Sequence, residues 1–178
     1  IFERAKTLRG QQRIERDNGE DLYFYFLDKD NWSSNTFQVT NQVTIEGVYK
    51  NRYDVTILVN GLPLIQIELK RRGVEMAEAF HQIVRYKKNS FASGSALYQY
   101  VQLFVISNGV NTKYFANNKT LNVKQTFYWG DENNKKISNL SDFADSFLEP
   151  HHLHKMLSKY IVLAETEKAL MVLRPYQY

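Results

Sequence analysis

Residues 52–86 read RYDVTILVNGLPLIQIELKRRGVEMAEAFHQIVRY, and their pattern predicts the central elements of the fold. The apolar run that starts at Asp54 is rich in β-branched and aliphatic residues, which predicts a strand. An Asn-Gly pair at 60–61 is typical of a tight turn, and the apolar run at 64–70 predicts a second strand. Together they predict a β-hairpin that folds the second strand back onto the first.

Polar side chains share one face of the second predicted strand. Because residues two apart point to the same side, Gln66, Glu68 and Lys70 line one face and apolar residues line the other. The hairpin should bring Asp54 near Glu68 or Lys70. Glu-x-Lys on a strand is, taken alone, more often a solvated and charge-paired surface. Charge is costly within an otherwise apolar strand, however, and this favours a functional role.

These residue types point to metal-dependent phosphate chemistry. Two carboxylates that converge repel each other unless a cation lies between them, and carboxylate oxygens are ligands that suit Mg²⁺. A lysine beside them can stabilise charge on a phosphate or orient an attacking water. Asp54, Glu68 and Lys70 therefore predict a metal-dependent nuclease site.

A helix is expected after Gly73. Gln82 and Tyr86 are four residues apart and share a helix face at the edge of the apolar stripe, so we expect both to face the site rather than the core. An ordinary amphipathic helix with polar flanks is the simpler explanation of these two residues taken alone. The residues at helical spacing that form the predicted buried stripe are Met76, Phe80, Ile83 and Val84.

The combination of Asp54, Glu68-Leu69-Lys70 and Gln82-x-x-x-Tyr86 resembles the PD-(D/E)xK nuclease superfamily in its QxxxY branch. Tyr53 stands where the superfamily has a proline, which contributes no ligand. The resemblance implies an α/β fold with a mixed central β-sheet flanked by helices, the restriction-endonuclease-like core.

A narrower resemblance covers roughly residues 35–178. The segments at 52–70, 79–86 and 100–117 closely resemble the amino-terminal nuclease domain of the R subunit of type I restriction–modification enzymes. This resemblance implies a Mg²⁺-dependent endonuclease that cuts double-stranded DNA without reading its sequence, after ATP-driven translocation by motor domains. It also implies methylation and specificity subunits as partners.

The resemblance assigns roles to individual residues. Asp54, Glu68 and the backbone carbonyl of Leu69 would hold Mg²⁺, and Lys70 would position water at the scissile phosphate. Relatives often add an acidic ligand from an early helix, for which Glu15, Glu20 and Asp21 are equal candidates. The full set of expected catalytic residues is Asp54, Glu68, Lys70, Gln82 and Tyr86.

Basic residues cluster around the expected site. They could meet phosphates that flank the cut, because backbone contacts position DNA without reading its sequence. A solvated basic face explains them equally well. The residues in question are Lys70, Arg71, Arg72, Arg85, Lys87 and Lys88.

The segment LMVLRPYQY at 170–178 resembles the opening of the helicase-like motor of type I R subunits, in which Gln177 would contact adenine as part of the Q motif. We therefore expect a nuclease domain at 1–170 and the start of the motor at 171–178. The chain contains no G-x-x-x-x-G-K-[ST] motif, so ATP is expected to bind only in the full-length subunit.

Composition sets wider limits. The chain has 178 residues, of which 43% are hydrophobic and 14% aromatic, as expected for one globular domain. Its lack of cysteine excludes disulfides and thiolate metal sites and fits a reducing cytoplasm; the resemblance to type I enzymes implies that this cytoplasm is prokaryotic. No apolar run approaches the ~18 residues of a membrane span, so no membrane partner is expected. The net charge of +4 permits DNA binding but does not argue for it.

Two alternatives remain open at this point. One is a nuclease of another DNA-processing system, in recombination, repair or phage biology. The other is a non-catalytic docking module of the R subunit.

The apolar run at 100–107 predicts a strand buried on both faces that follows a strand–helix crossover. Further expected elements are a helix or charged lead-in at 3–16, strands at 23–27, 36–47, 112–117 and 126–129, and helices at 141–150 and 151–162.

Overall fold

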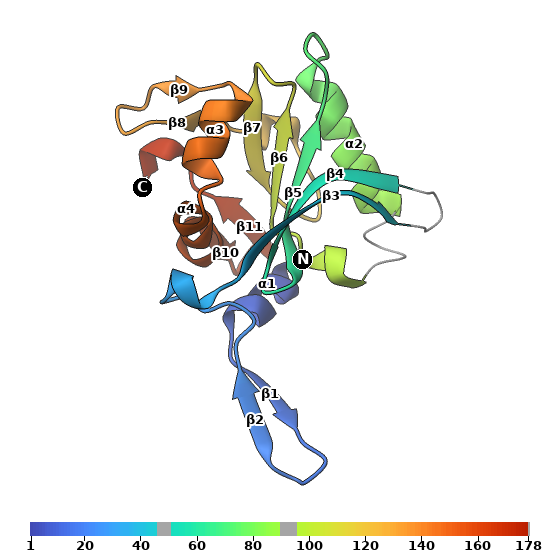
Figure 1. The fold of residues 1–178 in the computed structure, drawn as a ribbon, viewed down its shortest axis with the longest axis vertical. Helices are drawn as coiled ribbons and strands as arrows, with labels where there is room; N and C mark the ends of the chain where they lie inside the picture. Colours follow the sequence, from blue (N-terminus) through green and yellow to red (C-terminus); the bar gives the residue numbers. More distant parts are fainter. Residues whose placement is uncertain (46–50, 90–95, 178) are drawn as a thin grey trace.

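The computed structural model describes residues 1–45, 51–89 and 96–177. A five-stranded mixed sheet in the order β3-β4-β5-β6-β7 forms its centre, with β5 and β6 parallel and the other neighbours antiparallel (Figure 1). Helices flank this sheet, so the expected α/β class with a mixed central sheet is confirmed. The strands are β3 (Phe37–Ile45), β4 (Asn51–Val59), β5 (Leu62–Leu69), β6 (Leu103–Ser107) and β7 (Thr112–Ala116).

The β4–β5 hairpin forms as predicted. Asn60 and the glycine after it adopt φ angles of 51° and 78°, and such positive angles at both central residues are what the tight hairpin turn requires. Val55 pairs with Ile67 across the hairpin. One step further along the same register, Asp54 lies across from Glu68.

Helix α2 (Met76–Asn89) connects β5 to β6 and packs on one face of the sheet. Phe80 and Ile83 are buried there, and Met76 and Val84 pack at the margin of the same cluster, as the predicted stripe required. The sheet contributes the side chains of Phe104, Ile106 and Phe115 to this cluster, which is the smaller of the two hydrophobic clusters described.

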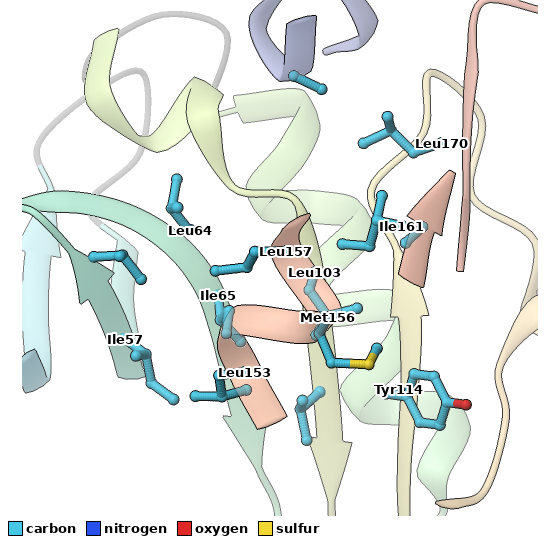
Figure 2. Packing of buried hydrophobic residues seen from close by; sticks show 14 of the residues in the cluster. Ile57, Leu64, Ile65, Leu103, Tyr114, Leu153, Met156, Leu157, Ile161 and Leu170 are labelled. Atoms are coloured by element: carbon cyan, nitrogen blue, oxygen red, sulfur yellow. The ribbon is translucent and has the colours of Figure 1, made fainter. Parts of the chain in front are cut away.

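The other face of the sheet carries the larger core. Leu153, Met156 and Leu157 lie against Ile65 and Leu103 of the sheet (Figure 2). The main helices of this layer are α1 (Phe2–Arg9), α3 (Leu140–Phe147), α4 (Pro150–Lys155) and a π-helical turn, η4 (Met156–Tyr160). Single 3₁₀ turns complete the chain at η1 (Trp32–Ser34), η2 (Ala96–Tyr100), η3 (Val123–Gln125) and η5 (Pro175–Gln177).

The amino-terminal segment departs from expectation. The helix expected over 3–16 ends at Arg9, and β1 (Gln12–Glu15) and β2 (Asp21–Phe24) form an antiparallel hairpin that projects from the body (Figure 1). An Asn-Gly turn, whose Gly19 has a φ of 81°, makes this hairpin possible. The strand expected at 23–27 is its second arm, which begins earlier and ends at Phe24.

The carboxy-terminal segment is also partly different. The helix expected at 141–150 is α3, but the one expected at 151–162 stops at Tyr160. A hairpin of β10 (Ile161–Ala164) and β11 (Ala169–Val172) follows, with Leu170 buried in the core. The expected boundary between residues 170 and 171 therefore falls within β11.

Four strand expectations need smaller corrections. The strand expected at 126–129 reduces to β8 (Trp129–Gly130), which pairs with β9 (Lys136–Ile137). The strand expected at 100–107 begins at Leu103, and that at 112–117 is β7. The strand expected at 36–47 is β3, and its last two residues lie outside the described residues.

In the described parts of the chain, no helix has both the length and the apolar character that crossing a membrane demands.

Candidate active site

The β4–β5 hairpin brings two carboxylates together. Asp54 is half-buried, and its Oδ2 accepts a hydrogen bond of 2.8 Å from the backbone N–H of Leu69. Glu68 precedes Leu69 and lies across from Asp54 in the register of the two strands. The hairpin thus places both residues where the sequence predicted.

Glu68 carries a fully buried carboxylate. Its Oε1 accepts a hydrogen bond of 2.8 Å from Lys70 Nζ, whereas its Oε2 is buried and has no hydrogen-bond partner within the described residues. Burial raises the pKa of Glu68 from 4.5 to about 7; the hydrogen bond from Lys70 opposes this rise and the charge of Asp54 adds to it. Glu68 is therefore a carboxylate held in a place that favours its neutral form.

A chain of hydrogen bonds links Lys70 to α2. Lys70 Nζ also donates to Gln82 Oε1, and Gln82 Nε2 donates to the hydroxyl of Tyr86. The Tyr86 hydroxyl in turn donates to the carbonyl of Arg52 at 2.8 Å. Gln82 and Tyr86 are therefore connected to Lys70 through their side chains, and not merely near it.

The orientation of Tyr86 corrects the prediction that it faces the site rather than the core. Its ring is 4% exposed and packs edge-on against Tyr53 of β4 with ring centroids 4.7 Å apart. Only the hydroxyl reaches the polar network. Burial raises the pKa of Tyr86 to about 12, so the hydroxyl remains a proton donor at neutral pH. The helical wheel could not reveal this depth because it depends on Tyr53 of another strand.

Asn108, the residue directly after β6, supports the segment that follows Lys70 and was given no role by the sequence. Its Nδ2 donates to the carbonyl of Val74 at 2.8 Å, and its Oδ1 accepts from the N–H groups of Val110 and Asn111. The backbone N–H of Lys70 itself donates to the backbone carbonyl of Ser107 at 2.7 Å. Asn108 therefore ties the loop after Lys70 to the β6–β7 turn. The Asn-Gly pair that ends a buried strand was the available signal.

A second buried polar group lies on the same face of the hairpin. Thr56 Oγ1 donates to Gln66 Oε1 at 2.8 Å and lies 3.1 Å from the hydroxyl of Tyr98. Gln66 was predicted to share the face of Glu68 but was given no function. Its amide oxygen is occupied by Thr56, so it supports the strand pairing beside the carboxylates.

The basic residues fall into two groups. Arg71, Arg72, Arg85 and Lys88 are exposed, as phosphate contacts require. Lys87 differs, because its Nζ is buried and it lines a separate hollow together with α1. The structure therefore does not place Lys87 with the other basic residues of α2.

The early acidic candidates are not brought to Asp54 and Glu68. Glu15 and Asp21 belong to the projecting β1–β2 hairpin, and Glu20 lies in its loop. Across residues 1–45, 51–89 and 96–177, no three or more His, Cys, Asp or Glu side chains gather closely enough to hold a metal ion.

Gln177, expected to contact adenine in a full-length subunit, lies in η5. Its Oε1 accepts a hydrogen bond of 2.8 Å from the N–H of Arg174. It lines a hollow of about 430 Å³ together with Phe127 and Tyr176.

Comparison with known proteins adds an independent line of evidence. The family model described as type I restriction enzyme R protein N terminus matches residues 3–123. The chain is 51% identical over 178 residues to the type I restriction enzyme SauCOLORF180P endonuclease subunit of Staphylococcus aureus (strain COL). That match covers 99% of this chain and 19% of the relative.

Two further relatives extend the similarity. The type I restriction enzyme EcoprrI endonuclease subunit of Escherichia coli is 48% identical over 164 residues, which cover 90% of this chain and 52% of that protein. The HindI endonuclease subunit of Haemophilus influenzae is 28% identical over 175 residues, covering 91% and 16% of the two chains. This chain thus spans about a fifth of the length of its Staphylococcus aureus relative.

Proposed function

This chain belongs to the family of type I restriction enzyme R protein N termini, and from that premise we propose that it is a Mg²⁺-dependent DNA endonuclease domain. The observation that carries the proposal is the buried carboxylate of Glu68. It faces Asp54, is bound on one oxygen by Lys70, and has no partner for its second oxygen within the described residues.

The donor set fits a magnesium ion. Asp54 and Glu68 supply hard carboxylate oxygens, and the backbone carbonyl of Leu69 is the third proposed protein ligand. A bound Mg²⁺ would polarise the scissile phosphate and lower the pKa of an attacking water. The Oε2 of Glu68 supports this assignment because, in the ionised form, it is a buried oxygen without a donor among the described residues, which is costly, and a cation would satisfy it.

Lys70 is the proposed positioning group for water and phosphate. Its ammonium is held between Glu68 and the side-chain oxygen of Gln82, so its place is fixed before DNA arrives. A fixed cation there can orient the attacking water and offset charge that develops on the phosphate. Gln82 and Tyr86 are positioning residues in this scheme, because they act through Lys70 and are not required to touch DNA.

The wider role belongs to the full-length subunit. We propose that cleavage follows ATP-driven translocation by motor domains that begin near residue 171, with Gln177 in their Q motif. In this scheme, methylation and specificity subunits help to deliver double-stranded DNA before it is cut, in a prokaryotic cytoplasm. Arg71, Arg72, Arg85 and Lys88 are the proposed phosphate contacts beside the cut.

The test separates the nuclease from the motor. In the assembled full-length enzyme, Asp54→Ala, Glu68→Gln and Lys70→Ala should each abolish DNA cleavage while ATP hydrolysis persists, because the motor lies outside the nuclease domain. Exposed Glu167→Gln is the matched control and should cut normally. Normal cleavage by the three site variants would instead identify this domain as a docking module.

A further inference from the structure

A hollow separate from the carboxylate site opens beside α1. It has a volume of about 560 Å³ and lies where α1, the end of α2, the segment after β7 and the β10–β11 turn meet. Positive charge dominates its lining, which has a single carboxylate, that of Glu3. The cationic residues are Arg4, Lys87, Lys119 and Lys168.

Lys87 is the most unusual of these cations. Its Nζ is buried, and none of the described residues provides it with a hydrogen-bond partner. Burial lowers the pKa of Lys87 from 10.5 to about 8, so the side chain still carries its charge at neutral pH. A desolvated ammonium without a counter-charge is costly, and an anion in the hollow would satisfy it.

The surrounding groups are already oriented. Arg4 donates to Gln99 through Nη2. Lys168 is held by Glu165 at 3.0 Å and lies 4.9 Å from the centre of the Phe2 ring. Lys168 is largely exposed, whereas the Arg4–Gln99 pair is part-buried. Because Arg4 is already held, less side-chain entropy is lost when an anion binds beside it.

Asn117 gives the hollow a second unsatisfied group. Its Nδ2 donates to the carbonyl of Val101 at 2.7 Å, whereas its Oδ1 is buried without a hydrogen-bond partner in the described chain. The hollow therefore combines several cations with one free acceptor. This combination suits an anion that also carries a donor, or that brings an ordered water with it.

We propose that this hollow binds a phosphate group, with Lys87 as its principal contact and with Arg4 and Lys119 beside it. Lys87 takes no part in the Lys70–Gln82–Tyr86 network, so this site is distinct from the carboxylate site and does not depend on cleavage chemistry. Phosphate could come from a DNA backbone or from a free nucleotide. Both present anionic phosphate oxygens, which several cations around one group can recognise, although a backbone phosphodiester carries one negative charge and a terminal phosphate carries up to two.

The first arm of the test measures binding of a short DNA duplex by the full-length subunit in EDTA, where no cleavage occurs. Lys87→Met should weaken binding and reduce the slope of log affinity against log salt by about 0.9, the value for one lost phosphate contact. Lys87→Arg, which keeps a cation at this position, should retain both the affinity and the slope of wild type. The matched control is Lys159→Met, which removes an exposed cation that does not line the hollow and should leave the slope unchanged.

The second arm titrates thymidine monophosphate and inorganic phosphate into the same variants by calorimetry. Binding that Lys87→Met abolishes would identify a free phosphate ester as the ligand, and an effect confined to the duplex would identify the DNA backbone. If Lys87→Met changes neither duplex nor nucleotide binding, the proposal is wrong. Folding is checked by thermal denaturation. Lys87→Met should not lower the melting temperature, because the substitution removes a desolvated charge.

The two arms also distinguish this proposal from that of the nuclease site. Because EDTA removes divalent ions, a failure of Asp54 or Glu68 to act in catalysis would leave both readouts unaffected. Impaired assembly with partner subunits, with DNA and nucleotide binding unchanged, would indicate an acidic protein partner and would overturn the phosphate assignment.

Discussion

Replacing Glu68 by glutamine should change how stability depends on pH. Burial raises the pKa of Glu68 from 4.5 to about 7 in the folded chain. Between these values the folded state binds more protons than the unfolded state, so stability present below pH 4.5 is lost as the pH rises through 7. At about 1.36 kcal/mol per pH unit, the loss amounts to roughly 3 kcal/mol.

Urea denaturation of the 178-residue chain without divalent ions measures this effect. The free energy of unfolding of wild type, relative to Glu68→Gln, should fall by about 3 kcal/mol as the pH rises through the window set by these two pKa values. The exposed carboxylate of Glu167 provides the control, because Glu167→Gln should run parallel to wild type. Parallel curves for wild type and Glu68→Gln would mean that Glu68 does not have a raised pKa in the folded chain.

Magnesium gives the same experiment a second readout. An ion that binds the folded state alone stabilises it by mass action. At the alkaline end of the window, saturating Mg²⁺ should therefore raise the stability of wild type and leave Glu68→Gln unchanged. Equal stabilisation of both proteins would place the ion somewhere other than Glu68.

Phe80→Ala should destabilise the domain by about 3–5 kcal/mol, as for other large-to-small core changes. Gln82→Ala should lower DNA cleavage with little change in thermal stability. If Gln82→Ala is the strongly destabilised variant and Phe80→Ala is not, the faces of α2 are misassigned. Tyr86→Phe keeps the ring packing but removes the hydroxyl between Gln82 and Arg52, so single-turnover cleavage should fall while the melting temperature stays close to wild type. Asn108→Ala leaves the carbonyl of Val74 without its donor and should cost about 1–3 kcal/mol. The cleavage rate of Asn108→Ala should also fall at temperatures where the variant is folded. A purely structural role for Asn108 would leave the rate unchanged at those temperatures.

The sequence was sufficient to predict the carboxylate hairpin because the rules involved are local. The period of two along β5 assigns Glu68 and Lys70 to one face, and the Asn-Gly turn folds β5 back onto β4. A register shift between Ile57 and Leu58, which the sequence did not predict, completes the pairing that brings Asp54 across from Glu68. The helical period likewise gave the buried positions Phe80 and Ile83. Each of these predictions needs only residues within one hairpin or one helix.

The parts that the sequence did not predict depend on contacts between distant segments. Asn108 acts on the loop after Lys70 only because β6 lies parallel to β5. Tyr86 is drawn into the core by Tyr53, which no helical wheel includes. The β10–β11 hairpin exists because Ile161 and Leu170 complete the main core, and a short apolar run does not reveal which core it joins.

Metal binding by three variants of the 178-residue chain tests the proposed division of labour most directly. Calorimetric titration with Mn²⁺ as a probe for the Mg²⁺ site should show one site in wild type, loss of that site in Asp54→Asn and Glu68→Gln, and its retention in Lys70→Met, because an ammonium is not a metal ligand. Retained binding in both carboxylate variants would contradict the assignment of Asp54 and Glu68 as the residues that hold the ion.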